Sequence, residues 1–324
     1  MKTLKEIQEY IHQTICNLNW KKQPYGLYEP ISYTLEAGGK RVRPCLLLMT
    51  ADMYGADLKE ATATALALEI FHNFTLLHDD VMDHSAQRRG RATVHIKWNE
   101  NTAILSGDQM MIEAYKQMEP LSAEHLKTIF PLFNKMATEI CEGQQYDVDF
   151  ESRNDVTIEE YTLMIRLKTA VLLATALKAG ALLGNATQEE AQALYEFGIN
   201  IGLAFQIKDD YLDVYGDEKT FGKPIGGDIL CGKKTYMWLS AWNNANPEQR
   251  QALSQWLEKT QVAPADKIEA VRNLYTQIGA HAQCEVAMEK YHQIAIAQLD
   301  KIDKEGNKTQ ELRNLAKKLM DRNK

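Results

Sequence analysis

Apolar residues recur along this chain at the three- and four-residue spacing of an amphipathic helix. Long segments of this kind cover residues 61–77, 163–183, 191–214 and 268–302. Alternating runs of the strand type, bounded by turn residues, are hard to find. The pattern therefore predicts an all-α protein with about ten or more helices. No low-complexity linker interrupts it, so we expect one domain over residues 1–324.

Glycine, proline and short polar residues mark where these helices should end, because they favour turns over helix interiors. The predicted breaks lie near residues 22–24, 38–39, 55–57, 88–90, 120–122, 184–187, 216–232 and 243–247.

Two of the predicted helices end in the same acidic motif, DDxxD. The first is LLHDDVMD, residues 76–83, and the second is QIKDDYLD, residues 206–213. Residues three and four apart share a helix face, so each motif gathers three carboxylates that repel one another. Mg²⁺ would offset this repulsion, since it binds through one or two carboxylates together with substrate phosphates and water. A single such motif could be a solvated helix end, but two copies on apolar helices favour a metal site.

Basic residues accompany both motifs. GGKRVRP (38–44) and QRRG (87–90) carry cations near the first motif, and GKPIGGDILCGKKTY (222–236) carries lysines after the second. Arginine and lysine bind phosphate oxygens, whereas a carboxylate can approach a diphosphate only through a metal ion. If Mg²⁺ bridges the carboxylates and the diphosphate, and guanidinium groups contact the outer phosphate oxygens, every charge lies beside an opposite one.

The composition restricts the remaining possibilities. The 324 residues are 45% hydrophobic and carry a formal net charge of −7, which makes a nucleic acid an improbable partner. Five scattered cysteines form no CxxC pair, so neither a disulfide framework nor a zinc knuckle is expected. The first residues are charged throughout and contain no signal-peptide pattern, and no stretch is long enough to span a bilayer. We expect a cytoplasmic protein without an integral membrane segment.

The chain carries, in order, GGKRVRP, LLHDDVMDHSAQRRG, GDQM, EGQQYD, KTA, FQIKDDYLD and GKPIGGDILCGKKTY. In these segments it resembles the trans-isoprenyl diphosphate synthases, the polyprenyl synthetase family that includes the farnesyl and geranylgeranyl diphosphate synthases. The resemblance covers about 200 residues, and the paired DDxxD motifs make it specific. It implies a single large helical bundle of the isoprenoid synthase type with a central cavity.

The resemblance also implies a role for individual residues. Mg²⁺, about three ions per active site, would be held by Asp79, Asp80, Asp83, Asp209, Asp210 and Asp213. Isopentenyl diphosphate would be bound by Lys40, Arg43, His72 and Arg89. The allylic substrate would be surrounded by Arg88, Lys168, Thr169, Gln206, Lys223 and Lys233. Arg88, Lys168, Thr169 and Gln206 would act catalytically, with Gln144 and Asp147 supporting the site.

The implied reaction is the head-to-tail condensation of isopentenyl diphosphate with an allylic diphosphate, which is dimethylallyl, geranyl or farnesyl diphosphate. Phe74 lies five residues before Asp79, roughly 7–8 Å along a helix axis, and Phe71 lies one turn deeper. In the resembling family, an aromatic residue at the Phe74 position is typical of a geranylgeranyl product. We expect that twenty-carbon product, with the fifteen-carbon farnesyl chain or a longer polyprenyl chain as alternatives.

Two other functions fit part of the pattern. A terpene cyclase also uses a DDxxD on a helical fold, but GGKRVRP and the second DDxxD argue against it. A non-catalytic regulatory subunit of a synthase should have lost aspartates or Lys168, and none is lost. The family resemblance further suggests a homodimer.

Overall fold

The structure is a computed structural model that describes residues 3–217, 225–259 and 261–320. In this part of the chain nearly every regular element is a helix, and the one sheet is a two-stranded hairpin of β1 (Gln87–Arg88) and β2 (Arg91–Ala92). The all-α prediction is confirmed. No helix of the described residues has the length and apolar character needed to cross a membrane.

The chain divides into two compact units. The first comprises Met1–Asn134 and Thr175–Gln192, and the second comprises Lys135–Ala174 and Ala193–Lys324. The boundaries fall inside three helices, namely α7 (Ala123–Ser152), α9 (Val171–Leu183) and α10 (Gln188–Tyr215). The single domain expected from the sequence stays a prediction.

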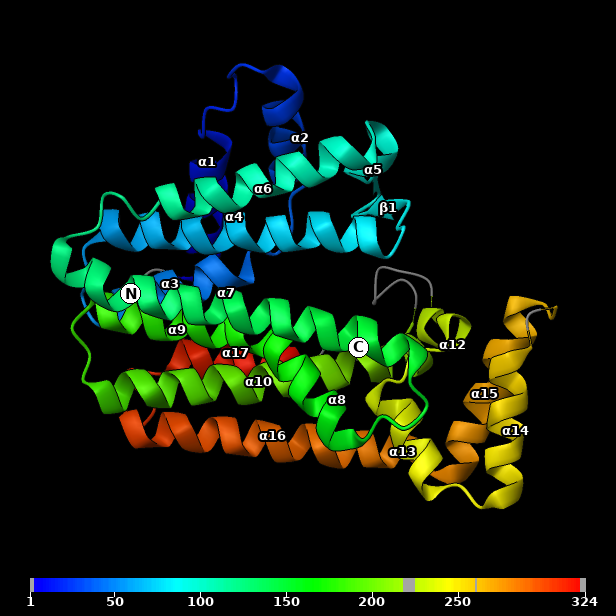
Figure 1. Ribbon diagram of the computed structural model, residues 1–324. Coiled ribbons are helices and arrows are strands. Elements are labelled where there is room, and N and C mark those ends of the chain that lie inside the picture. Colours follow the sequence, from blue (N-terminus) through cyan, green and yellow to red (C-terminus); the bar gives the residue numbers. More distant parts are fainter. Residues whose placement is uncertain (1–2, 218–224, 260, 321–324) are drawn as a thin grey trace. The chain divides into compact units, whose positions relative to one another are not determined.

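The first unit is built around α4, which lies alongside α6 (Figure 1). The helices α2, α3 and α5 pack on this pair, and α1 packs on α3 and α2. Besides parts of α7, α9 and α10, the unit contains α1 (Leu4–Cys16), α2 (Tyr25–Glu36), α3 (Val42–Met53), α4 (Leu58–Met82), α5 (Val94–Lys97) and α6 (Glu100–Lys116). Its core is strongly apolar, with Phe71, Phe133 and Leu47 almost completely buried.

The second unit is formed by residues 135–174 and 193–324. Its elements are α8 (Ile158–Ile165), the π-helical turn η1 (Arg166–Ala170), α12 (Gly227–Cys231), α13 (Tyr236–Asn244), α14 (Pro247–Glu258), α15 (Pro264–Ile278), α16 (Ala280–Ile302) and α17 (Gln310–Met320), with the remaining parts of α7, α9 and α10. Within this unit α13 packs on α15 and α16.

Local chemistry explains where the two motif-bearing helices begin and end. The Asp57 carboxylate accepts hydrogen bonds from the amides of Lys59 and Glu60 and so caps the start of α4. Thr187 and Glu190 form a reciprocal capping pair at the start of α10. Each helix is apolar for most of its length and reaches its acidic motif in its last turns, as the sequence predicted.

One of the predicted helical segments is not continuous. The apolar spacing over residues 268–302 indicated one helix, but Gly279 adopts a φ of +82° and separates α15 from α16. A glycine at this left-handed position satisfies the carbonyls at the end of α15. The helical spacing of apolar residues continues on both sides of Gly279, so the periodicity did not reveal the break.

Candidate active site

The first DDxxD motif is paired with Arg88 at the end of α4. The Arg88 Nε donates to Asp80 Oδ1 at 2.8 Å, and its Nη2 donates to Asp79 Oδ2 at 3.5 Å. Asp80 is only 5% exposed, and this burial raises the pKa of its carboxyl while Arg88 opposes the rise. Asp83 caps the helix and is exposed, with its amide bonded to the Asp79 carbonyl at 2.8 Å. The three carboxylates therefore occupy different environments.

The hairpin after α4 presents two arginines in different directions. Arg89 and Gly90, at the turn between β1 and β2, have φ values of +52° and +72°. Positive φ at both central residues is the geometry of the tight turns that suit a twisted hairpin. Arg88, on β1, contacts the aspartates, whereas the Arg89 guanidinium donates to the carbonyl of Gly38. The turn thus connects the first motif to the GGKRVRP segment.

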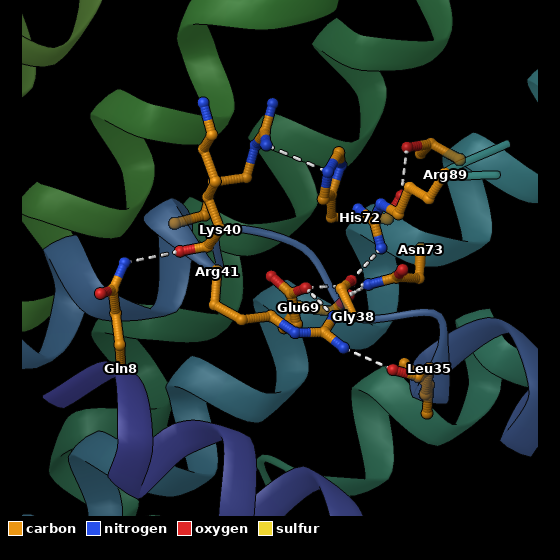
Figure 2. A network of polar contacts seen from close by, with 11 residues as sticks. Gln8, Leu35, Gly38, Lys40, Arg41, Glu69, His72, Asn73 and Arg89 are labelled. Carbon is orange, nitrogen blue, oxygen red and sulfur yellow. Dashed lines mark hydrogen bonds and ion pairs between the residues drawn. The ribbon is translucent and has the colours of Figure 1, made fainter. Parts of the chain in front are cut away.

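Predicted diphosphate-binding cations from two segments lie near His72, namely Arg43 of GGKRVRP, which contacts it, and Arg89 of the hairpin turn, which Figure 2 shows beside it. Arg43 Nη1 lies 3.0 Å from His72 Nε2, and because a guanidinium can only donate, His72 accepts through Nε2 and carries its proton on Nδ1. Burial, followed by the nearby arginines, holds the pKa of His72 well below its ordinary value. His72 is therefore neutral. Burial also lowers the pKa of Arg43, to about 10.

Gly39 permits the close approach of Arg89 to this loop. Its φ is +125°, and a Cβ placed on it would lie 2.9 Å from Arg89 Cζ. A side chain at this position would suffer both an unfavourable backbone conformation and a steric overlap. Gly39 of GGKRVRP is therefore required by the geometry of the loop.

An aromatic cluster lies on the same helix as the first motif. Phe71 packs edge-to-face on Phe74 and on Phe133, each with ring centroids 5.4 Å apart. Tyr115 packs on Phe133 at 5.1 Å, and Phe74 packs on His78 at 4.8 Å. Phe74 retains 9% exposure and Phe71 only 1%, so Phe74 is the more accessible of the two residues predicted to limit product length.

The second motif, in the second unit, supports the segment that follows it. Asp210 accepts hydrogen bonds from the Tyr161 hydroxyl, the Tyr236 amide at 3.1 Å and Gln206 Nε2 at 3.2 Å. Burial, followed by the charge of Asp228, raises the pKa of Asp210 to about 7.

Asp213 and Asp209 differ in burial, as the aspartates of the first motif do. The Asp213 carboxylate, 4% exposed, accepts from the amide of Asp228 at 3.0 Å. Asp209 is half-buried. The aspartates with substantial exposure are Asp79, Asp83 and Asp209, and those buried against protein donors are Asp80, Asp210 and Asp213.

Lys168 and Thr169 lie on the π-helical turn η1. The Lys168 Nζ donates to Asp147 Oδ2 at 2.5 Å, and Thr169 Oγ1 donates to Gln206 Oε1 at 3.4 Å. Gly143 makes room for the turn, since a Cβ there would overlap the Lys168 amide nitrogen and approach the Leu167 carbonyl carbon to 2.8 Å. A π-helical turn inside a helix frequently marks a functional site, and it brings these predicted catalytic residues together.

Gln144, Lys223 and Lys233 complete the set of predicted residues. Gln144 lies on α7, next to Gly143. Lys223 lies outside the described residues. Lys233 is exposed between α12 and α13, while its neighbour Lys234 donates to the carbonyls of Phe150 and Glu151 at 3.1 and 2.9 Å.

The sequence interpretation missed Tyr161 and the buried charged residues Arg41 and Glu69. Nothing in the hydrophobic pattern marks Tyr161. Glu69, however, is a charged residue within the apolar run ALEIF, which could have indicated a buried charged side chain.

The donor chemistry of the exposed aspartates suits a hard divalent cation, which prefers carboxylate oxygens. Within the described ranges, no group of three or more histidine, cysteine, aspartate or glutamate side chains is arranged to hold a metal ion.

Comparison with known proteins supports the interpretation of these motifs. The polyprenyl synthetase family model matches residues 24–275. The chain is 42% identical over 241 residues to the geranylgeranyl diphosphate synthase of Methanosarcina mazei, covering 74% of each protein. It is 37% identical over 316 residues to the geranylgeranyl diphosphate synthase of Saccharolobus solfataricus, covering 94% of each. A crystal structure of a geranylgeranyl pyrophosphate synthase matches with a TM-score of 0.93 and 42% identity, covering 100% of both chains. The chain belongs to the polyprenyl synthetase family, and it is an isoprenyl diphosphate synthase, a prenyltransferase.

Proposed function

We propose that this enzyme joins isopentenyl diphosphate to an allylic diphosphate and releases geranylgeranyl diphosphate. The observation that carries the proposal is the arrangement in the first unit, where Arg88 contacts Asp79 and Asp80 and the next residue reaches the cationic loop. An acidic helix end and a cluster of phosphate-binding cations are thus connected by one hairpin. The relatives named as geranylgeranyl diphosphate synthases support the choice of product.

The family is magnesium-dependent. We assign the direct ligands to Asp79, Asp83 and Asp209, because these retain exposure, and we expect about three ions per active site. When bound, Mg²⁺ would neutralise the charge that develops on the leaving diphosphate. Of the six predicted ligands, Asp80, Asp210 and Asp213 would support the site through their protein hydrogen bonds.

Binding of isopentenyl diphosphate would use Lys40, Arg43, Arg89 and His72. The three cations would contact phosphate oxygens. His72, neutral and with its Nε2 engaged by Arg43, would donate through Nδ1 without adding charge. Substrate binding in this cluster would offset the repulsion between the cations.

The allylic diphosphate would be held by Arg88, Lys223 and Lys233. Its carbon–oxygen bond breaks, and the electron pair leaves with the diphosphate. The double bond of isopentenyl diphosphate then forms the new carbon–carbon bond, and a proton passes to the departed diphosphate. The carbonyl of Lys168 and the side-chain oxygens of Thr169 and Gln206 would stabilise the positive charge without reacting with it.

Product length would be limited by Phe74, with Phe71 behind it. The growing chain would run along α4 away from Asp79, and the partly accessible Phe74 ring would meet it first. A farnesyl product would follow if the chain stops earlier, and a longer polyprenyl product if these rings move aside.

We further propose that the enzyme is a cytoplasmic homodimer. On α6 the apolar side chains of Ile104, Leu105 and Ile112 are 43%, 59% and 50% exposed and share one face, and Phe130 of α7 is 42% exposed. Apolar side chains gathered in this way are typical of an interface between subunits. Sedimentation of the wild type should give a dimer, and the variant Leu105→Asp should shift it toward the monomer.

The test of the function uses the purified chain with labelled isopentenyl diphosphate, Mg²⁺ and each of the three allylic primers. We expect a twenty-carbon product, identified by chromatography after dephosphorylation, and no product in the presence of a chelator. Product formed from an allylic diphosphate without isopentenyl diphosphate would indicate a cyclase. A chain that turns over only with a second protein would be a regulatory subunit. Either result would contradict the proposal.

A further inference from the structure

The side chains of Lys40, Arg43 and Arg89 form a cationic cluster, and a buried ion pair lies beneath it. Neither residue of the pair was predicted to bind substrate. Arg41 and Glu69 are paired through Nη1 and Oε1, and each side chain is only 3% exposed. Arg41 also donates through Nη2 to the carbonyl of Leu35, at the end of α2. Asn73 donates through Nδ2 to Glu69 Oε1 at 3.0 Å (Figure 2). The network therefore ties the end of α2 and the start of α3 to the middle of α4.

The pair fixes an unusual backbone conformation. Arg41 has φ +47° and ψ +36°, the left-handed region, which is unfavourable for a residue with a Cβ. It occupies this conformation at the N-terminus of α3, between Lys40 and Arg43. The side chain of Arg41 points inward to Glu69, while the flanking residues carry the cations proposed to bind diphosphate. The direction of those cations thus depends on the conformation of Arg41.

Further hydrogen bonds hold the same loop from outside. Gln8 Nε2, from α1, donates to the carbonyl of Lys40 at 3.0 Å, and Arg89 donates to the carbonyl of Gly38. These contacts and the Arg41–Glu69 pair together restrain residues 38–41, as Figure 2 shows.

Glu69 also offsets the positive charge of the cluster. Its carboxylate raises the pKa values of Arg43 and Arg89, which burial and neighbouring arginines lower. A buried ion pair adds little net stability compared with apolar residues of similar size. Here the Arg41–Glu69 pair places a carboxylate behind the proposed diphosphate-binding residues and fixes the conformation of their loop.

We propose that Glu69, acting through Arg41, is a positioning residue for the diphosphate of isopentenyl diphosphate. The inference rests on the proposed function, since it assumes that Lys40, Arg43 and Arg89 bind this substrate. Two effects of removing the carboxylate oppose each other. A more positive cluster would attract diphosphate more strongly, whereas a released loop would misplace its ligands. Positioning is the larger effect, so loss of the Glu69 charge weakens binding of isopentenyl diphosphate.

The test compares Glu69→Gln, which keeps the shape of the side chain, with Gln8→Ala, which removes one hydrogen bond from a half-buried surface position. For Glu69→Gln we expect the KM for isopentenyl diphosphate to rise at least about tenfold, while kcat and the KM for the primer stay unchanged. For Gln8→Ala we expect a rise of about two- to tenfold, the effect of one hydrogen bond. Glu113→Gln is the matched control, because Glu113 is also buried and ion-paired in the first unit.

Calorimetric binding of isopentenyl diphosphate without primer provides a second measurement that does not depend on turnover. A wild type that binds but gives no product would overturn the proposed function and leave the positioning role to be decided by binding. An unchanged or lower KM and Kd in Glu69→Gln, or an equal change in Glu113→Gln, would overturn the positioning role. If Glu69→Gln does not fold, Gln8→Ala decides, and unchanged binding there refutes the proposal.

Discussion

Replacing Phe74 by alanine should lengthen the product by one isoprene unit. Phe71 is the next large side chain along α4, three residues further from the motif and therefore about 4.5 Å deeper at 1.5 Å per residue. An extended isoprene unit adds four main-chain bonds and so spans about 5 Å, because three bonds of an extended chain span about 3.8 Å. The space released by the Phe74 ring thus matches one unit, and Phe71, which still packs on Phe133, becomes the new limit.

The assay is the chain-length profile of the variant with each primer, measured well below its thermal midpoint. A buried phenylalanine replaced by alanine costs about 3–5 kcal/mol of stability, so a general loosening of the fold must be separated from a specific effect. Ile31→Ala provides this control, because Ile31 is completely buried on α2 of the same unit. We expect a twenty-five-carbon product from Phe74→Ala and an unchanged product from Ile31→Ala.

An unchanged chain-length profile for Phe74→Ala would show that Phe74 does not control product length. Equal lengthening in Ile31→Ala would refute it differently, by showing that any cavity in the unit relaxes the limit.

Three other predictions concern the metal site, the π-helical turn and acid stability. Asp83→Ala should raise the Mg²⁺ concentration needed for half-maximal rate while leaving the thermal midpoint unchanged, since Asp83 is exposed; a metal titration checks this, and an unaltered requirement would contradict the assignment. Gly143→Ala should lower kcat at least about tenfold, because the added methyl would displace the backbone of Lys168; single-turnover rates check this, and wild-type kcat would contradict it. Burial would raise the pKa of Glu60, but hydrogen bonds from a backbone amide and His125 lower it below the ordinary glutamate value. This carboxylate therefore contributes stability above pH about 4.3 that is lost as pH falls through its lowered pKa. Urea unfolding between neutral and acidic pH should show a smaller loss for Glu60→Gln than for the wild type, and parallel curves would exclude the effect.

The extent to which the sequence predicted this site differs between its parts. The two DDxxD motifs and the GGKRVRP segment were recognisable because their chemistry lies in short contiguous runs. The pairing of Arg88 with Asp79 and Asp80 follows from a hairpin that returns the chain to the end of α4, so nearby residues suffice to predict it. Asp147 was expected to support the site, and its carboxylate accepts from Lys168 Nζ at 2.5 Å; the supporting role stays a prediction.

Other features depend on contacts between distant segments, and no local pattern reveals them. The three carboxylates of each motif look equivalent in sequence, yet Asp210 accepts from Tyr161, which is 49 positions away, while Asp209 does not share its burial. The π-helical turn needs the close approach of Gly143 from another helix.

The helical class, the ends of the two acidic helices and the kinds of ligand available could all be predicted from the amino-acid sequence. These follow from periodicity, capping residues and charge, which act over a few neighbouring positions. The folded structure was needed to show which aspartates are buried, that His72 is neutral, and that Arg41 turns inward to Glu69. The physical reason is that desolvation and hydrogen bonding depend on everything packed around a group, and packing joins residues that the sequence separates.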